Sequence, residues 1–110
     1  MPTFIVQGRY TKDAIHGMMA KPEDRGPEVA KLVEAFGGKM HGYYVTFGDH
    51  DFLMVCEGPD EKAVASAVLV AAAGGGVTDL KTTVAMTSAE AKDVFAKAGE
   101  GAKAFRPAGS

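Results

Sequence analysis

Residues Gly38–Glu57, with the sequence GKMHGYYVTFGDHDFLMVCE, decide the fold of this chain. The first half predicts a strand over Lys39–Phe47, and the second half, apolar on both faces, predicts a strand over Asp51–Glu57. A short connection that contains glycine and joins two such runs is typical of an antiparallel hairpin. We therefore expect a central hairpin closed by a tight turn rich in polar side chains.

Two elements and a short extra helix are predicted before this hairpin. Thr3–Tyr10 alternates apolar and polar residues, which indicates a strand. Thr11 is suited to cap a short helix, which must end at the break that begins near Pro22. A second helix then starts near Pro27 with apolar residues at helical spacing, and it ends at the Gly37 pair because glycine accepts the left-handed cap conformation.

Three further elements are predicted after the hairpin. Asp60 is suited to cap a helix over Ala63–Ala73, whose nearly all-round apolar surface must be covered on most sides. Alternation over Leu80–Met86 predicts the fourth strand. Thr87–Glu90 fits the Ser/Thr-x-x-Glu capping box and opens a last helix, whose two largest apolar residues we expect to face inward.

The order strand-helix-strand-strand-helix-strand indicates an α+β fold: a ferredoxin-like βαββαβ sandwich with a C-terminal helix. One chain supplies helices for a single face of the sheet, whereas the strands carry bulky apolar residues on both faces. We therefore expect a homo-oligomer, at least a dimer, whose sheets pack face to face as a dimeric α+β barrel. The domain is expected over residues 1–98, and residues 99–110 are expected to form a flexible tail.

Composition excludes several classes of function. A net charge of −2, with acidic and basic residues interspersed, offers no basic stripe for nucleic acid and no polybasic membrane patch. The start of the chain does not read as a signal peptide, and the longest apolar run, Ala63–Val77, is too short to span a bilayer, so we expect a cytoplasmic protein. The single cysteine, Cys56, lies in an apolar strand, where an inert buried thiol is expected rather than a nucleophile.

The turn Asp49-His50-Asp51 is the densest polar cluster at a strand junction. Because histidine titrates near neutral pH, His50 could act as a general acid or base oriented by Asp51, with Asp49 as a ligand contact. Metal binding is a weaker alternative, since one histidine beside two aspartates is no metal signature. Ordinary turn chemistry explains the same residues through carboxylates that bind backbone amides. The turn role and the catalytic role both stay open, and neither a metal nor another cofactor is predicted.

A second group of polar residues is expected to contact a small molecule. His41 and Tyr43 are expected to share one strand face, and if that face lines a cleft they are natural polar contacts for a ligand. Otherwise they lie at the wet rim of the sheet. His16, in the first short helix, could complete a pocket with Arg9 and Tyr10, and the alternative for it is a plain surface histidine.

Four short stretches carry a family resemblance: Met1–Val6, Gly37–Lys39, Gly42–Gly48 and Asp51–Phe52. With them, residues 2–98 resemble the GYD-domain family, small and largely uncharacterised proteins of the dimeric α+β barrel class. The resemblance implies the fold and the pairing of subunits but no settled activity. The family has a turn of sequence Gly-x-Tyr-Asp. In this chain His50 stands in the place of that tyrosine, so a titratable imidazole replaces a hydroxyl.

Two functions from different classes follow from these residues. The first is a small oligomeric domain that binds a small molecule in a pocket beside the central hairpin. The second is a cofactor-independent enzyme of the isomerase, tautomerase or monooxygenase type that uses His50 as acid and base. A purely structural assembly unit is a third reading, and whether the protein is an enzyme stays open.

Overall fold

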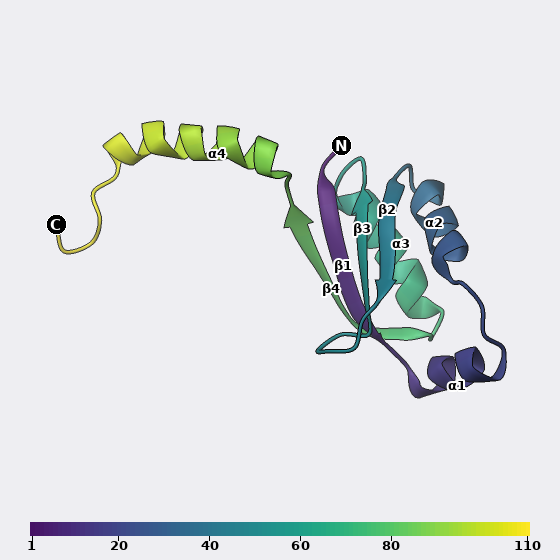
Figure 1. Ribbon diagram of the computed structural model, residues 1–110. Helices are drawn as coiled ribbons and strands as arrows, with labels where there is room; N and C mark the ends of the chain where they lie inside the picture. Colours follow the sequence, from purple (N-terminus) through teal and green to yellow (C-terminus); the bar gives the residue numbers. More distant parts are fainter.

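Four antiparallel strands form one sheet in the computed structural model, which describes residues 1–110 (Figure 1). The strands are β1 (Thr3–Tyr10), β2 (Lys39–Val45), β3 (Phe52–Glu57) and β4 (Val77–Ala85). Their order across the sheet is β2-β3-β1-β4, so the first strand lies in the middle and pairs with both β3 and β4. This is the ferredoxin-like order, and the predicted α+β class is confirmed.

The helices are α1 (Lys12–Ala20), α2 (Gly26–Ala35), α3 (Glu61–Ala73) and α4 (Ser88–Gly101), followed by a short 3-10 turn, η1 (Ala102–Ala104). Figure 1 shows α2 and α3 on the same side of the sheet, as predicted for the two crossover helices. None of the helices combines the length and the apolar character that a membrane crossing requires.

The helix ends are fixed where the sequence placed them. The Thr11 hydroxyl accepts a hydrogen bond from a backbone amide at the start of α1 (3.2 Å), and Asp60 accepts one from the Ala63 amide at the start of α3 (2.8 Å). Thr87 and Glu90 form both bonds of the predicted capping box at the start of α4. Side chains thus satisfy amides that each helix leaves unpaired at its start.

The core lies between the sheet and the two crossover helices. Alternate residues of β1 and β3 form one side of the core, and one residue each from α2 and α3 forms the other. In the order β1, β3, α2 and α3, these residues are Phe4, Val6, Phe52, Met54, Cys56, Val33 and Val64. Each such side chain contributes about 1.5–3 kcal/mol when it is fully removed from water. The register joins Phe4 to Cys56 and Val6 to Met54, so these four side chains lie on one face of the sheet.

The opposite face of the sheet has no helix of its own chain over it (Figure 1). Ile5 of β1 pairs with Val55 of β3, and Leu53 pairs with Tyr44 of β2 on the same face. These side chains are half-buried at most, and Tyr44 is exposed. We call this surface the open face. Its centre is apolar because β3 is apolar on both sides, whereas Gln7 of β1 and Lys81 and Thr83 of β4 make its other edge polar.

A β-bulge in β2 changes which side chains share a face. The register shifts between Met40 and Gly42, so the residue between them is out of phase with the rest of the strand. Tyr43 pairs with Met54 and lies on the core face, whereas His41 contacts Glu57 and lies on the open face. The prediction that His41 and Tyr43 share a face is therefore wrong, because one extra residue inverts the alternation.

Helix α4 projects away from the rest of the chain (Figure 1). Its largest apolar residues, Val94 and Phe95, are 50% and 76% exposed, so the prediction that they face the core of their own chain is wrong. Only Met86 and Thr87 separate α4 from β4, so the helix begins directly beyond the end of this edge strand. The helix runs to Gly101, slightly past residue 99, and flexibility of the tail stays a prediction.

Candidate functional site

A cavity of about 100 Å³ lies between the sheet and the helices α2 and α3. On the side of α3 it is lined by Ala63, Ala67 and Ala71, which recur every fourth residue and so lie on one side of the helix, and by Val64 and Val68 beside them. Met54 and Cys56 of β3 line the opposite wall. Small side chains on α3 leave the space open, because larger ones at the same positions would reach the sheet.

A wider groove of about 440 Å³ adjoins this cavity. Residues of α1, the segment before α2 and the end of α3 form its walls. Five residues line both spaces, namely Val29, Leu32, Tyr43, Ala71 and Val77. The cavity and the groove are therefore contiguous, and together they form one site with an apolar interior and an open mouth.

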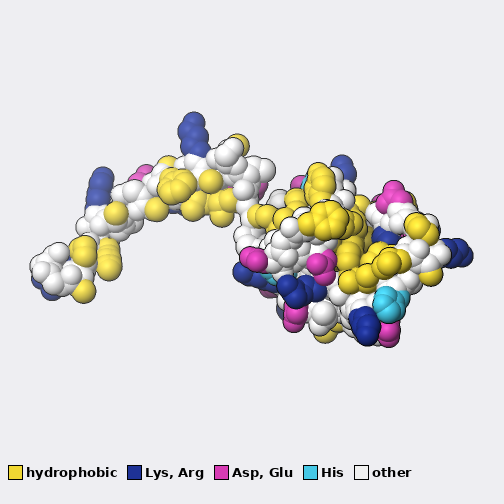
Figure 2. All heavy atoms as spheres, turned by 60° about the horizontal axis from the view of Figure 1, so that its bottom comes forward, with side chains coloured by type: hydrophobic (Ala, Val, Ile, Leu, Met, Phe, Trp, Pro, Cys, Tyr) yellow, Lys and Arg dark blue, Asp and Glu magenta, His cyan; other side chains and the backbone are white.

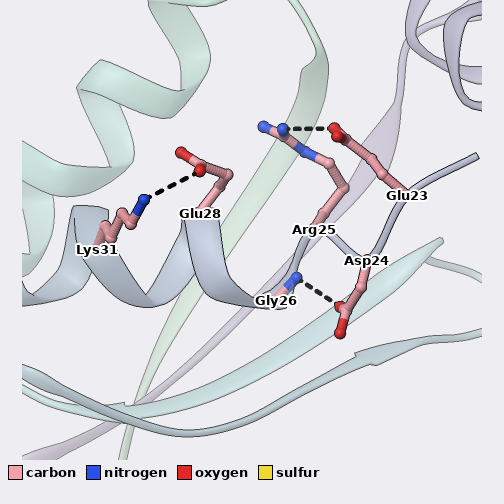
Figure 3. Close-up of polar contacts among 6 residues, drawn as sticks. All are labelled: Glu23, Asp24, Arg25, Gly26, Glu28 and Lys31. Atoms are coloured by element: carbon pink, nitrogen blue, oxygen red, sulfur yellow. Dashed lines mark hydrogen bonds and ion pairs between the residues drawn. The ribbon is translucent and has the colours of Figure 1, made fainter. Parts of the chain in front are cut away.

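Charged side chains surround the mouth of the groove. Arg25 pairs with Glu23 (Nη1 to Oε1, 2.8 Å), and Glu28 pairs with Lys31 (Oε1 to Nζ, 3.3 Å), as Figure 3 shows. Arg25, Glu23 and Glu28 line the groove, and so does Lys21, which belongs to no ion pair. Because these pairs are exposed to solvent, they contribute little to stability, and their side chains are free to meet a ligand instead.

The segment before α2 is shaped by a second local bond. The carboxylate of Asp24 accepts a hydrogen bond from the backbone amide of Gly26 (2.9 Å), which bends the chain into the helix. In Figure 3 the side chains of Arg25 and Glu28 project to one side of this segment and Asp24 to the other. Arg25 and Glu28 line the groove, whereas Asp24 has a structural role.

Two tyrosines lie where the groove meets the cavity. The hydroxyls of Tyr10 and Tyr43 share a hydrogen bond, and both rings pack against Phe52, with centroids 5.4 and 5.8 Å away. Burial, together with the hydrogen bond to Tyr10, raises the pKa of Tyr43, while Arg25 lowers it by a smaller amount. The Tyr43 hydroxyl is thus neutral at physiological pH, where it can donate or accept a hydrogen bond but not act as a base.

The polar turn is fastened to the end of β1. An Asp51 carboxylate oxygen accepts a hydrogen bond from the Tyr10 amide (2.9 Å), and the Arg9 side chain donates to the Asp49 carbonyl oxygen (3.2 Å). The His50 carbonyl accepts from the Thr46 hydroxyl (2.7 Å), and no hydrogen bond joins the His50 imidazole to either aspartate. This arrangement favours turn chemistry, and catalysis by His50 and Asp51 stays a prediction.

The remaining predicted residues lie apart from the site. His41 Nε2 is 3.6 Å from the Glu57 carboxylate, at the end of the hairpin away from the turn. His16 is exposed on α1 and is absent from the groove, although its neighbours Ala14, Gly17 and Met18 line it. The expected pocket of His16, Arg9 and Tyr10 is therefore not formed, because α1 presents its other side to the groove.

Neither a metal centre nor a reactive thiol is visible in this fold. No group of three or more His, Cys, Asp or Glu side chains is arranged to hold a metal ion. Cys56 is 2% exposed, so the expectation of a buried cysteine is confirmed, and burial raises the pKa of its thiol, which disfavours the reactive thiolate. The lining of the site offers apolar contact in the cavity and hydrogen bonding and charge at the mouth of the groove.

The sheet order and the two helices on one face define the chain as a ferredoxin-like α+β domain. Residues 4–95 match the sequence model of the GYD domain. The chain belongs to the GYD domain family, and the resemblance drawn from the sequence is confirmed.

One curated relative and two solved structures are informative. A Thermus thermophilus protein named glutamine synthetase and cystathionine beta-lyase binding protein is 35% identical over 77 residues, which cover 70% of this chain and 81% of the relative. A crystal structure of a protein from Thermus thermophilus matches with a TM-score of 0.52 at 16% identity, covering 80% of this chain and 96% of that one.

A transcriptional regulator from Neisseria meningitidis, solved as a complex with L-Met, matches with a TM-score of 0.52 at 17% identity. The match covers 79% of this chain and 51% of the regulator. At such low identity, both structural matches show a shared fold and nothing more about function.

Proposed function

We propose that this protein is a non-enzymatic domain that binds a small molecule and works as a homodimer. The observation that carries the proposal is the apolar cavity beneath the helices, contiguous with a groove whose mouth is charged. Ligand sites combine apolar walls with a few polar groups that orient the ligand. Tyr10 and Tyr43 supply such groups at the junction of the two spaces.

The lining indicates the kind of molecule that fits. An apolar group would enter the cavity between α3 and the sheet, where the walls offer almost no polar partner. A polar end would meet the tyrosine hydroxyls and the charges of Lys21, Glu23, Arg25 and Glu28 at the mouth. The ligand is thus a small amphipathic molecule. The L-Met complex of the Neisseria regulator is an example of small-molecule binding by a protein of this fold.

The open face supports the homodimer. Ile5, Val55, Leu53 and Tyr44 place an apolar surface on the side of the sheet without helices. Surfaces of this kind in soluble domains mark interfaces. Two open faces packed together would cover one another and give the paired-sheet barrel expected from the sequence.

The test combines native mass spectrometry of the purified protein with thermal unfolding in the presence of small amphipathic molecules. A ligand that binds the folded state raises the midpoint with a saturable dependence on concentration. Tyr43→Phe removes one hydroxyl and should weaken binding by about 2–10-fold, in keeping with the loss of one hydrogen bond. Tyr44→Phe is the matched control, because Tyr44 lies on the open face and is exposed.

Two results would count against a ligand site beneath the helices. One is the absence of any bound mass or thermal shift across the molecules tested. The other is an equal loss of affinity in Tyr43→Phe and Tyr44→Phe, since only Tyr43 lines the site.

Binding of an enzyme partner is a second candidate function. The Thermus relative is named for binding two enzymes, and in this chain Phe47 is 99% exposed at the hairpin turn, as an aromatic contact for another protein would be. Co-purification with glutamine synthetase or cystathionine beta-lyase of the same cell, lost in Phe47→Ser, would support it. Retention of the partner by Phe47→Ser would exclude this turn as the contact.

A further inference from the structure

Helix α4 carries an apolar stripe that nothing in its own chain covers. Ala91, Val94, Phe95 and Ala98 follow the spacing i, i+3, i+4 and i+7, which places them along one side of the helix. Figure 2 shows apolar side chains gathered along one side of α4, with lysines projecting away from them. A helix of 14 residues is marginal by itself in water, so a surface that buries this stripe would stabilise it.

Helix α4 does not fold back onto the core of its own chain. Met86 and Thr87 alone connect β4 to the helix, and the Thr87–Glu90 capping box holds the first turn of α4 directly beyond this short connection. Figure 1 shows the helix extending beyond the edge strand, away from α2 and α3. The molecule is accordingly 61 Å long but only 32 and 22 Å in its other dimensions.

We propose that α4 is an arm exchanged between two copies of this chain. The arm of one copy packs on the second copy beside the paired open faces, and the arm of the second copy packs in the same way on the first. A two-fold axis makes such an exchange self-complementary and closed, so it ends at a dimer. The proposal concerns assembly alone and does not depend on a ligand in the cavity.

The areas involved favour a second copy as the occupant. Four strands about 4.8 Å apart and about seven residues long, at roughly 3.3 Å per residue, give an open face of about 440 Å². A stable interface buries about 800 Å² of accessible surface on each partner, which exceeds the flat footprint of the sheet alone. An arm of 14 residues is about 21 Å long and about 10 Å wide, a footprint of roughly 210 Å². With one arm given and one received, the footprint on each copy rises to about 860 Å².

Sedimentation equilibrium of the full chain over a range of concentrations tests the arm. Phe95→Ser, in the stripe, should raise the dimer dissociation constant at least tenfold, because two aromatic side chains per dimer lose their apolar contact. Ala96→Ser, on the opposite side of α4, is the control and should change it less than twofold. Circular dichroism and the thermal midpoint verify that both variants keep the fold.

Two results of this measurement would overturn the proposal. A monomeric wild-type protein at tens of micromolar would remove both the arm exchange and the paired sheets. An unchanged dissociation constant in Phe95→Ser would remove the arm exchange while leaving the paired sheets intact. Neither result depends on ligand binding, so the proposed small-molecule function stands or falls separately.

Cross-linking locates the arm directly. Ala98→Cys, which keeps Phe95, can carry a thiol-reactive photo-cross-linker, since the natural cysteine, Cys56, is buried. In an equal mixture of ¹⁴N- and ¹⁵N-labelled protein, cross-links from residue 98 between light and heavy chains support the exchange. Cross-links from residue 98 confined to single chains would overturn it.

Discussion

Replacing Ala67 by leucine is expected to fill the cavity beneath α3 and to stabilise the folded protein. Ala67 lines this cavity of about 100 Å³, midway along the wall formed by α3. A single buried water needs only about 10–15 Å³ of such space, so the added atoms have room. Leucine and alanine are both good helix formers, so the backbone of α3 should not change.

The magnitude follows from the atoms added. Leucine brings three more carbon atoms than alanine, and at about 0.8 kcal/mol for each buried group the upper limit is about 2.4 kcal/mol. Imperfect fit costs part of this gain, which leaves an expected stabilisation of about 1–2 kcal/mol. For a domain of about 100 residues, 1 kcal/mol corresponds to about 4–8 °C, so the thermal midpoint should rise by roughly 4–16 °C.

Urea unfolding and thermal melts of Ala67→Leu, beside Ala72→Leu as an exposed control on the same helix, measure the effect. The control should stay within about 0.5 kcal/mol of the wild type. A loss of more than about 1 kcal/mol in Ala67→Leu alone would refute the reasoning, because it would mean that the space is already packed. In ligand titrations the same variant should lose binding, and undiminished affinity would place the ligand elsewhere.

Three further changes have definite expected outcomes. Gly38→Ala would bring a Cβ atom within 2.5 Å of the Glu57 carbonyl oxygen. The free energy of unfolding from urea titration should therefore fall by about 1–3 kcal/mol. An unchanged value would contradict this backbone contact. The pKa of Tyr43 is raised above its ordinary value of 10.0, so the folded state favours the neutral hydroxyl. The stability that this hydroxyl contributes is complete below pH 10 and is lost as the pH rises further. Above pH 10 the thermal midpoint of Tyr43→Phe should therefore depend less on pH than that of the wild type. Hydrogen bonds from Thr87 lower the pKa of Glu90 below its ordinary value of 4.5, so this cap is complete above that pH and is lost as the pH falls through the lowered pKa. The hydrogen-exchange protection factors of the first turn of α4, taken relative to intrinsic rates at each pH, should fall on acidification and in Thr87→Ala, and unchanged protection factors would refute the cap.

Most of the fold could be predicted because local signals and the global architecture agree. The caps at Thr11, Asp60 and Thr87, the alternation in β1 and the apolar run of β3 each have a local physical cause that does not depend on distant contacts. The position of α4 could not be predicted in the same way. The stripe that contains Phe95 shows that the helix has an apolar side, but only the path of the chain shows that its own core does not receive it.

The candidate site was predicted only in part. Tyr10 and Tyr43 were selected from the sequence, and they do meet at the groove. His41 was misplaced because a single bulge residue, which leaves no mark in the residue pattern, inverts the faces of β2. The signal that was missed is the recurrence of alanine at 63, 67 and 71, since small residues on the buried side of a helix leave space beneath it.

The pairing of Tyr10 with Tyr43 gives the protein its own optical reporter. The chain has three tyrosines and no tryptophan, so tyrosine dominates its near-ultraviolet absorption and emission. Two of the three tyrosines share a hydrogen bond at the entrance to the cavity, and the third, Tyr44, lies exposed on the open face. A molecule bound in the cavity would contact Tyr43, which lines it, so its arrival should change the intrinsic spectrum without any label.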